Sequence, residues 1–506
     1  MAIGFNNIPD TIRTPGTYAE IDNSRALTGL AANPHKVLIV GQKIDAGTTA
    51  FDTLVAVTKD GLADGFFGPG SINARMCNIF KNNNPNTELY AMAIGSGIAG
   101  TAAEGILDLS LVLNSNDYSG TATLYLMVNG KRGGNYDLAI TSGMSAGGIA
   151  SIMASTINGD STLPFVAALS AVDAASMGNI TFSAVQSGTL GNYLDIRFNY
   201  DVGNSFPPGF STTPSTVVFA GGATDPDLDD AWAVIDGEKF QHIIQPYITA
   251  VALTSLEDEL EDRFGPLVDQ QGHGYTAIRA TQAGATTLGN SRNSPHNTIF
   301  GVYDAPHSPE EWAAGFGAIC AFNLNQDPAR PLHYLKVKGL LPPPTENRFT
   351  RAERDILLYD GIATFVVDTG GNVLIERAIT TYQSNALGLP DVSYLDIQTL
   401  ATLGEIRDQY GIRMANRFII PRFKLADDGA PIQPGTFVIT PSGIAQEIVA
   451  LFTELRNAGL IENIDAFIEN LRVERDASDR NRVNVLLPPD LINQFRVLAG
   501  LIQFIL

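Results

Sequence analysis

The sequence contains one glycine-rich motif that could hold a nucleotide. Residues 95–100 read Gly-Ser-Gly-Ile-Ala-Gly, which matches the G-x-G-x-x-G pattern and follows an apolar run typical of a strand. A dinucleotide site also needs a helix directly after the glycines, because the N-terminus of that helix binds the pyrophosphate. Here the motif leads through Gly105 into a region rich in small residues. We therefore interpret residues 95–105 as an inter-domain linker and expect no cofactor.

The histidines are the next candidates for chemistry, as metal ligands. They stand at positions 35, 242, 273, 296, 307 and 333. None of them has another histidine four residues away or a cluster of cysteines nearby, which are the spacings typical of zinc sites. The sequence therefore gives no support for a bound metal.

A serine-hydrolase triad is the third chemical possibility. Asp269 could orient His273, and Ser442 could act as the nucleophile. However, Ser442 lies in the sequence Thr-Pro-Ser-Gly, which is neither the G-x-S-x-G turn nor the G-T-S-x-x-x-P pattern of subtilisin-like enzymes. We therefore interpret His273 as a turn histidine between two glycines and predict that the protein is not an enzyme.

Composition excludes several classes of partner. The 506 residues include 32 lysines and arginines against 53 aspartates and glutamates, giving a net charge of −21, which opposes binding to a nucleic-acid backbone. The most apolar terminal stretch, 497–506, is half the roughly 20 residues that span a bilayer. Cys77 and Cys320 form no disulfide framework, and residues 1–9 lack the features of a signal peptide. We expect a protein made in the cytoplasm that binds no nucleic acid and inserts into no membrane.

The elements that would position any site alternate between strands and helices. Residues 37–40 and 88–94 are continuous apolar runs typical of strands buried on both faces, and residues 71–80 between them resemble a helix. Alternation resumes after Asp225, with a predicted hairpin formed by 363–368 and 373–380. The pattern predicts an α/β core.

Between these two parts the composition shifts to glycine, serine, threonine and alanine. Strands are predicted at 123–128, 135–141, 179–184 and 193–200 around a helix at 146–157, and Asn129-Gly130 is a hairpin-turn signal. The predicted fold class is mixed α/β (α+β), with an inserted β-rich domain and extended terminal arms. The expected domains are an N-terminal arm (1–30), a first core part (31–105), the insertion (106–222), a second core part (223–490) and a C-terminal arm (491–506).

Three amphipathic helices are predicted in the second core part. The first carries Leu253, Leu256, Leu260 and Phe264 opposite an acidic run at 257–262, which we expect to be a solvated face. The second covers 397–410. The third covers 444–455, with Ser442 as its expected N-cap. A short helix is expected after Pro488-Pro489.

Both chain ends resemble arms that need a partner. Residues 17–22, with Tyr18 and Ile21, read as an isolated strand that must pair elsewhere. At the other end Leu498, Leu501, Phe504 and Leu506 give the tail more apolar surface than a solvated terminus tolerates. We expect both arms to join sheets of other subunits, although pairing of both ends within their own chain is the simpler alternative.

Several segments resemble the Mu-like phage tail sheath family. The residues that carry this resemblance lie at 8–24 (IPDTIRTPGTYAEIDNS), 287–301 (TLGNSRNSPHNTIFG), 329–332 (ARPL), 348–365 (RFTRAERDILLYDGIATF), 373–383 (VLIERAITTYQ), 393–403 (SYLDIQTLATL) and 473–500 (VERDASDRNRVNVLLPPDLINQFRVLAG). The resemblance is specific after residue 230 and weak in 111–222.

This resemblance implies a structural protein that polymerises helically around a tail tube and contracts to drive that tube through the host envelope. It implies contacts with other copies of the chain, the tail tube protein, and baseplate and tail terminator proteins, in a virion tail assembled in the host cytoplasm. We expect the tube-facing surface in the 444–455 helix or its flanking loops, with Glu447 and Glu454 as candidates. A secretion-system sheath is the nearest alternative, and a subtilisin-like hydrolase is a distant one.

Overall fold

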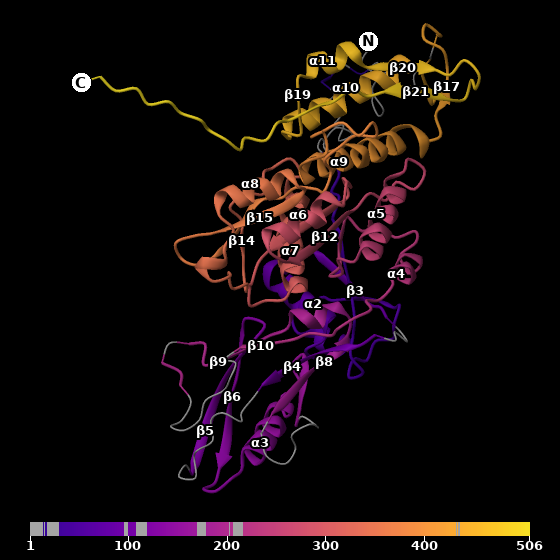
Figure 1. Cartoon of the computed structure of the whole chain (residues 1–506). Coiled ribbons are helices and arrows are strands. Elements are labelled where there is room, and N and C mark those ends of the chain that lie inside the picture. The colour runs from indigo at the N-terminus through magenta and orange to yellow at the C-terminus, as the bar shows by residue number, and fades with distance from the viewer. Residues whose placement is uncertain are drawn as a thin grey trace. The chain divides into compact units, whose positions relative to one another are not determined.

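The chain divides into two compact units, which are described separately. The larger unit comprises residues 34–404 and 493–506, and the smaller one comprises 1–33 and 405–492. The expected second core part, 223–490, is thus divided after Gly404. The computed structural model (Figure 1) describes residues 14, 16–17, 30–95, 100–107, 119–169, 179–201, 203–205, 216–431, 433 and 436–505.

A nine-stranded sheet in the order β14-β16-β15-β13-β12-β11-β1-β3-β2 forms the centre of the larger unit. From β15 to β3 the neighbouring strands pair in parallel, and the remaining strands pair antiparallel at the two edges. The predicted β-α-β pattern and the hairpin after residue 362 are confirmed. The strands are β1 (Lys36–Gly41), β2 (Leu54–Ala56), β3 (Glu88–Ala93), β11 (His242–Ile244), β12 (His273–Arg279), β13 (Asn297–Val302), β14 (Lys336–Val337), β15 (Ile362–Val367) and β16 (Val373–Arg377).

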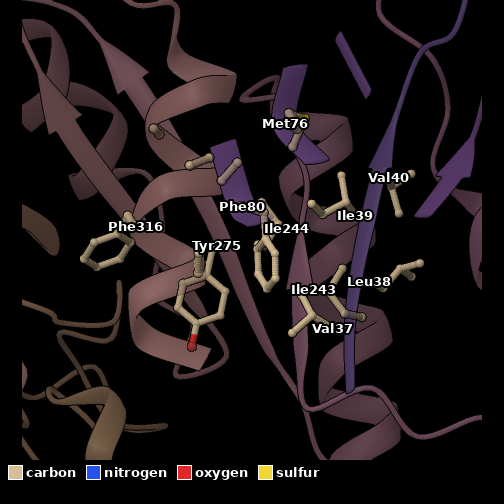
Figure 2. Packing of buried hydrophobic residues seen from close by; sticks show 14 of the residues in the cluster. Val37, Leu38, Ile39, Val40, Met76, Phe80, Ile243, Ile244, Tyr275 and Phe316 are labelled. Atoms are coloured by element: carbon tan, nitrogen blue, oxygen red, sulfur yellow. The ribbon is translucent and has the colours of Figure 1, made fainter. Parts of the chain in front are cut away.

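Helices cover both faces of this sheet. On one face α2 (Ile72–Asn83) and α7 (Pro309–Gln326) pack against the strands, and Figure 2 shows Phe80 and Phe316 of these helices beside Ile244 and Tyr275. On the other face α5 (Ala250–Phe264), α6 (Gln282–Asn290) and α8 (Arg351–Tyr359) enclose a second apolar cluster. The long apolar runs of the central strands are therefore buried on both sides, as predicted.

The β-rich module has its own core. Its two sheets have the orders β10-β9-β5-β6 and β4-β8-β7, and neither contains a strand of the central sheet. The predicted turn at Asn129-Gly130 is confirmed, with φ of 46° and 70°. Because β4 pairs with β8, the module starts before the expected boundary at residue 106. Its elements are β4 (Ala102–Leu107), β5 (Gly120–Val128), β6 (Lys131–Ile140), α3 (Ala146–Asn158), β7 (Phe165–Leu169), β8 (Ile180–Ser187), β9 (Asp195–Phe198) and β10 (Thr216–Val218).

A buried polar junction joins this module to the core. Lys131 Nζ lies 3.2 Å from Glu311 Oε1 at the start of α7, and His307 Nδ1 lies 3.0 Å from Glu311 Oε2. A Cβ at Gly130 would lie only 2.4 Å from His307 Nε2, so this turn requires glycine for space as well as for its positive φ. The module is thus held on the core by charge and close packing in addition to its linkers.

The smaller unit contains helices and short strand pairs. The serine N-cap prediction for α10 is wrong, because the Thr440 Oγ1 accepts the backbone N–H of Gly443 and Ser442 lies inside the first turn. The helix expected after Pro489 is also absent from residues 490–505, where β22 is the last regular element. The elements are the end of α9 (Ile397–Met414), a π-helical turn (Ala415–Ile419), β17 (Lys424–Leu425), β18 (Val438–Ile439), α10 (Pro441–Asn457), β19 (Ile461–Glu462), α11 (Ile464–Asn470), β20 (Arg472–Arg475), β21 (Val483–Leu486) and β22 (Asp490–Leu491).

The acidic face of α5 is less solvated than its sequence predicts. Leu253, Leu256 and Leu260 are buried as expected, but Glu257 is buried too, at 9% exposure. It accepts hydrogen bonds from Arg292 and from the Asn297 side chain. A buried carboxylate needs such partners, and they lie more than 30 residues further along the chain, beyond the reach of a helical pattern.

Candidate inter-subunit surfaces

The C-terminal arm is the most exposed apolar segment described. Residues 493–505 form no helix or strand, and Figure 1 shows them as an extended yellow trace. Leu498, Leu501 and Phe504 are 84%, 85% and 80% exposed. Phe495, Val497, Ile502 and Ile505 are similarly exposed, whereas Leu506 lies outside the described residues. A row of large apolar side chains in water indicates an interaction surface.

An ionic clamp fixes the start of this arm. Arg496 Nη1 donates to Asp396 Oδ1 at 2.6 Å, and Arg377 Nε donates to the same oxygen at 3.1 Å. Burial lowers the pKa of the Arg496 guanidinium, and the charge of Asp396 opposes that effect. Because both guanidinium groups are mostly buried, the carboxylate between them holds the chain at residue 496 and leaves the apolar residues beyond it exposed.

The β20–β21 hairpin offers an open sheet edge in the smaller unit. In the described part of the chain these two strands pair only with each other, over four residue pairs from Arg472↔Leu486 to Arg475↔Val483. An isolated two-stranded sheet is marginally stable in water and has edges that can accept a further strand. The N-terminal candidates Tyr18 and Ile21 lie outside the described residues.

The two tube-facing candidates lie in intramolecular ion pairs. Arg413 of α9 donates to Glu447 at 3.0 Å and also to Glu454, and Arg417 lies 3.2 Å from Glu447. The side chains of Glu447 and Glu454 are only 19% and 26% exposed. They therefore hold α10 against α9, while the exposed side of α10 carries Ser442, Gln446 and Ala450.

The proposed triad residues have other structural partners. His273 is buried, and its Nε2 lies 2.8 Å from Thr298 Oγ1. Ser442 Oγ lies 3.0 Å from Thr440 Oγ1 at the start of α10. In the glycine-rich motif, residues 96–99 lie outside the described part, and β4 rather than a helix follows Gly100. His273 and Ser442 thus each have a local hydrogen-bond partner in their own part of the fold.

Four histidines form a row that the sequence does not reveal. His35 precedes β1, His242 begins β11, His273 begins β12 and His296 precedes β13, and these four strands are neighbours in the sheet. His35 Nδ1 lies 3.0 Å from His242 Nε2, and His242 Nδ1 lies 3.0 Å from Tyr275 Oη. Among the described residues no group of three or more potential ligands could hold a metal ion.

This row predicts acid sensitivity. Burial, and next the charge of His296, lower the pKa of His273 from 6.5 to about 3, so the folded protein keeps this ring neutral. Below pH 6.5 the unfolded chain takes up a proton that the folded chain does not, and stability is lost as the pH falls toward 3. We expect His273→Asn to reduce the slope of unfolding free energy against pH by up to about 1.4 kcal/mol per pH unit between pH 6 and 4. Denaturant titrations measure this slope, and His333→Asn, at a half-buried loop position, is the control. An unchanged slope in His273→Asn would contradict the prediction.

The arm clamp is the feature that sequence reasoning missed. One signal for it exists, because Arg496 is the single charged residue between Leu491 and Leu506. A lone charge in an apolar segment needs a counter-ion. Nothing local identifies Asp396, which is 100 residues away.

Comparisons with known proteins identify the family. Residues 221–381 match the phage tail sheath protein central domain, and residues 390–505 match the phage tail sheath C-terminal domain. The Mu-like prophage FluMu tail sheath protein of Haemophilus influenzae is 38% identical over 507 residues, covering 100% of both chains.

None of the helices in the described ranges has both the length and the apolar character needed to span a bilayer.

Two solved structures show more distant similarity. The sheath tail protein from Desulfitobacterium hafniense is 12% identical, with a TM-score of 0.47, and the match covers 94% of this chain and 100% of that one. The helical sheath of the anti-feeding prophage in its contracted state is 9% identical, with a TM-score of 0.47 and coverage of 97% and 99%. The assignment rests on the two domain models and the full-length relative: the chain belongs to the Mu-like phage tail sheath proteins and is a structural subunit of a contractile tail sheath.

Proposed function

We propose that these sheath subunits are connected to one another by their two chain ends. The single observation that carries this proposal is the exposed apolar arm after Arg496. Complete burial of one large apolar side chain contributes about 1.5–3 kcal/mol. The arm therefore gains strongly when Leu498, Leu501, Phe504 and Leu506 enter another subunit, and Tyr18 and Ile21 are proposed to do the same at the other end.

The β20–β21 hairpin is the proposed acceptor of these arms. Each outer edge can take one strand by β-augmentation, in which main-chain hydrogen bonds supply affinity and alternate side chains supply specificity. A contact from one end of a subunit to a different surface of the next is heterologous, and repetition of such a contact generates a helical filament. Truncation after Arg496, followed by electron microscopy for hollow tubes, tests this proposal.

The arms also account for contraction without separation. A covalently continuous arm survives rotation of the body to which it belongs, so the linkages persist as hinges while subunits move. The energy would come from body-to-body contacts formed only in the contracted state. No catalysis or cofactor is needed. In this proposal the tail tube, baseplate and tail terminator are the partners, the β-rich module faces outward, and assembly takes place in the host cytoplasm.

The tube contact is proposed for the exposed side of α10, where the uncharged residues Ser442, Gln446 and Ala450 suit a surface that must release the tube. We expect Gln446→Lys to change tube-templated assembly and its salt dependence while leaving thermal stability within about 0.5 kcal/mol, since this side chain is exposed. Glu447→Lys is the matched comparison. It places a cation beside Arg413 and Arg417 and should destabilise the fold by about 1.5–3 kcal/mol. Normal tube-templated assembly of Gln446→Lys would exclude this side of α10.

A sheath of a secretion system is the second candidate. The full-length match to a Mu-like prophage tail sheath protein favours the phage type. Assembly of this chain alone into tubes would also fit the phage type. A requirement for a second, different sheath chain would favour a secretion-system sheath instead.

A further inference from the structure

The loop after α9 carries an exposed surface that the arms and α10 do not use. The basic patch consists of Ile419, Ile420, Arg422, Lys424 and Phe437. Ile419, Ile420 and Phe437 are 72%, 66% and 57% exposed. Arg422 and Lys424 are exposed as well, and neither has an ion-pair or hydrogen-bond partner for its side chain in the described ranges. Unpartnered cations stand out in a chain with a net charge of −21.

The patch is held in a defined shape. The Phe423 ring meets Phe418 and Phe437 edge to face, with centroids 5.8 and 5.5 Å apart. Backbone hydrogen bonds of 3.0 Å from Phe423 to Phe418 and of 2.7 Å from Lys424 to Phe437 close the loop. The apolar and cationic groups are therefore presented together by a packed scaffold.

This shape is maintained at an energetic cost. Arg422 and Phe437 have φ of 60° and 49°, in the left-handed region that non-glycine residues seldom adopt. Residues held in this region are strained and cluster at functional sites such as ligand clamps and switch regions. A π-helical turn, a feature frequent at functional sites, spans Ala415–Ile419 and ends shortly before Arg422.

The same chain carries a surface of complementary chemistry on α4 (Asp229–Val234) and α5. Trp232 Nε1 and Asp229 Oδ1 lie 2.8 and 2.7 Å from Ser255 Oγ, which fixes the two helices side by side. Val251 and Val234 add exposed apolar surface, at 72% and 38%. The exposed carboxylates of this acidic face are Asp227, Asp229, Asp230, Asp236, Asp258, Glu261 and Asp262.

We propose that the basic patch of one subunit docks on the acidic face of a second copy of this chain. Both surfaces combine exposed apolar side chains with charge, and their charges are opposite. The contact joins two different surfaces, so it is heterologous and propagates along a filament rather than closing a dimer. It rests on the proposed function, because it adds a body-to-body contact to the sheath that the arms connect.

Charge reversal and rescue test this contact. We expect Arg422→Glu with Lys424→Glu to abolish tubes in electron micrographs while the thermal melt stays unchanged, because both side chains are exposed. Asp258→Lys with Asp262→Lys should have the same effect, and the chain with all four changes should form tubes again. Lys59→Glu with Lys338→Glu, at two exposed lysines elsewhere, is the control. Normal tubes from the first pair, or no rescue by all four changes, overturns the proposal.

Zero-length carbodiimide cross-linking provides a readout on the unaltered chain. Sheath assembled from equal parts of ¹⁴N- and ¹⁵N-labelled chains should yield peptides that link Lys424 of one label to α4 or α5 carboxylates of the other. The proposal is overturned if Lys424 is linked only to peptides that carry the same label, or if it is linked to other carboxylates. It is also overturned if Lys424 is linked to the tube protein in tube-bound sheath. If the unaltered chain forms no tubes at all, the proposed function fails, whereas tubes without the cross-label link refute this contact alone.

Discussion

Removal of residues 497–506 is expected to abolish sheath formation and leave a folded, monomeric chain. The described apolar side chains of this arm are already exposed in the isolated subunit, so their loss removes almost no buried surface. We expect the unfolding free energy to change by no more than about 0.5 kcal/mol. The truncated chain keeps Arg496 and therefore the clamp to Asp396. Electron microscopy measures the loss of sheaths, size-exclusion chromatography the monomeric state, and thermal melting the stability of the truncated chain.

A full-length variant separates the role of the apolar side chains from that of chain length. Leu498→Ser, Leu501→Ser and Phe504→Ser together should reproduce the effect of truncation, since the backbone remains but the buried area in the neighbour is lost. Deletion of residues 1–24 tests the other arm in the same assays. Normal contracted tubes from either truncated chain would show that the corresponding end does not connect subunits.

Arg75→Met is expected to destabilise the larger unit by about 3–5 kcal/mol, the usual cost of leaving one member of a buried ion pair without its partner. Arg75 of α2 forms an ion pair with Glu310 of α7, and their side chains are 9% and 0% exposed. Arg75 Nη1 also donates to the Gly70 carbonyl at 2.8 Å. Loss of the guanidinium leaves Glu310 charged in the core without a counter-ion, and urea denaturation measures the cost.

The double variant distinguishes a buried charge from a simple loss of packing. Replacement of both residues in Arg75→Met, Glu310→Met removes the uncompensated charge, and we expect it to recover most of the lost stability. Lys131→Met provides a matched comparison, because Lys131 is 50% exposed and its loss should cost less even though it faces Glu311. A loss below 1 kcal/mol in Arg75→Met would show that Glu310 does not depend on this partner.

The local pattern of the chain was sufficient for most elements. The predicted strands at 37–40 and 88–94 are found as Lys36–Gly41 and Glu88–Ala93, because short apolar runs of this kind are typical of strands covered on both faces. Asn129-Gly130 forms the predicted hairpin turn, since both residues tolerate positive φ. The sequence segments that resemble the Mu-like phage tail sheath family also predicted the family, and the full-length relative confirms this prediction.

The local sequence pattern gave a wrong N-cap for α10, because two neighbouring residues can each accept the capping hydrogen bond. Thr440 and Ser442 both carry a hydroxyl at the start of α10, and the structure selects Thr440 as the N-cap. The tube-facing candidates Glu447 and Glu454 lie against Arg413, a partner that the sequence pattern did not indicate. The helical pattern gives the face on which a residue lies, but it does not give what packs against that face.

The sequence by itself determined the elements, the inserted module and the family, because each depends on side chains close together in the chain. Only the tertiary structure decided which distant residues contact one another. The Arg75–Glu310 pair joins residues 235 positions apart, and the clamp of Arg496 to Asp396 spans 100. The row of His35, His242 and His273 exists because parallel strands begin at one edge of a sheet, an order set by topology. Such contacts form only when the whole sheet is assembled, and short-range periodicity carries no information about them.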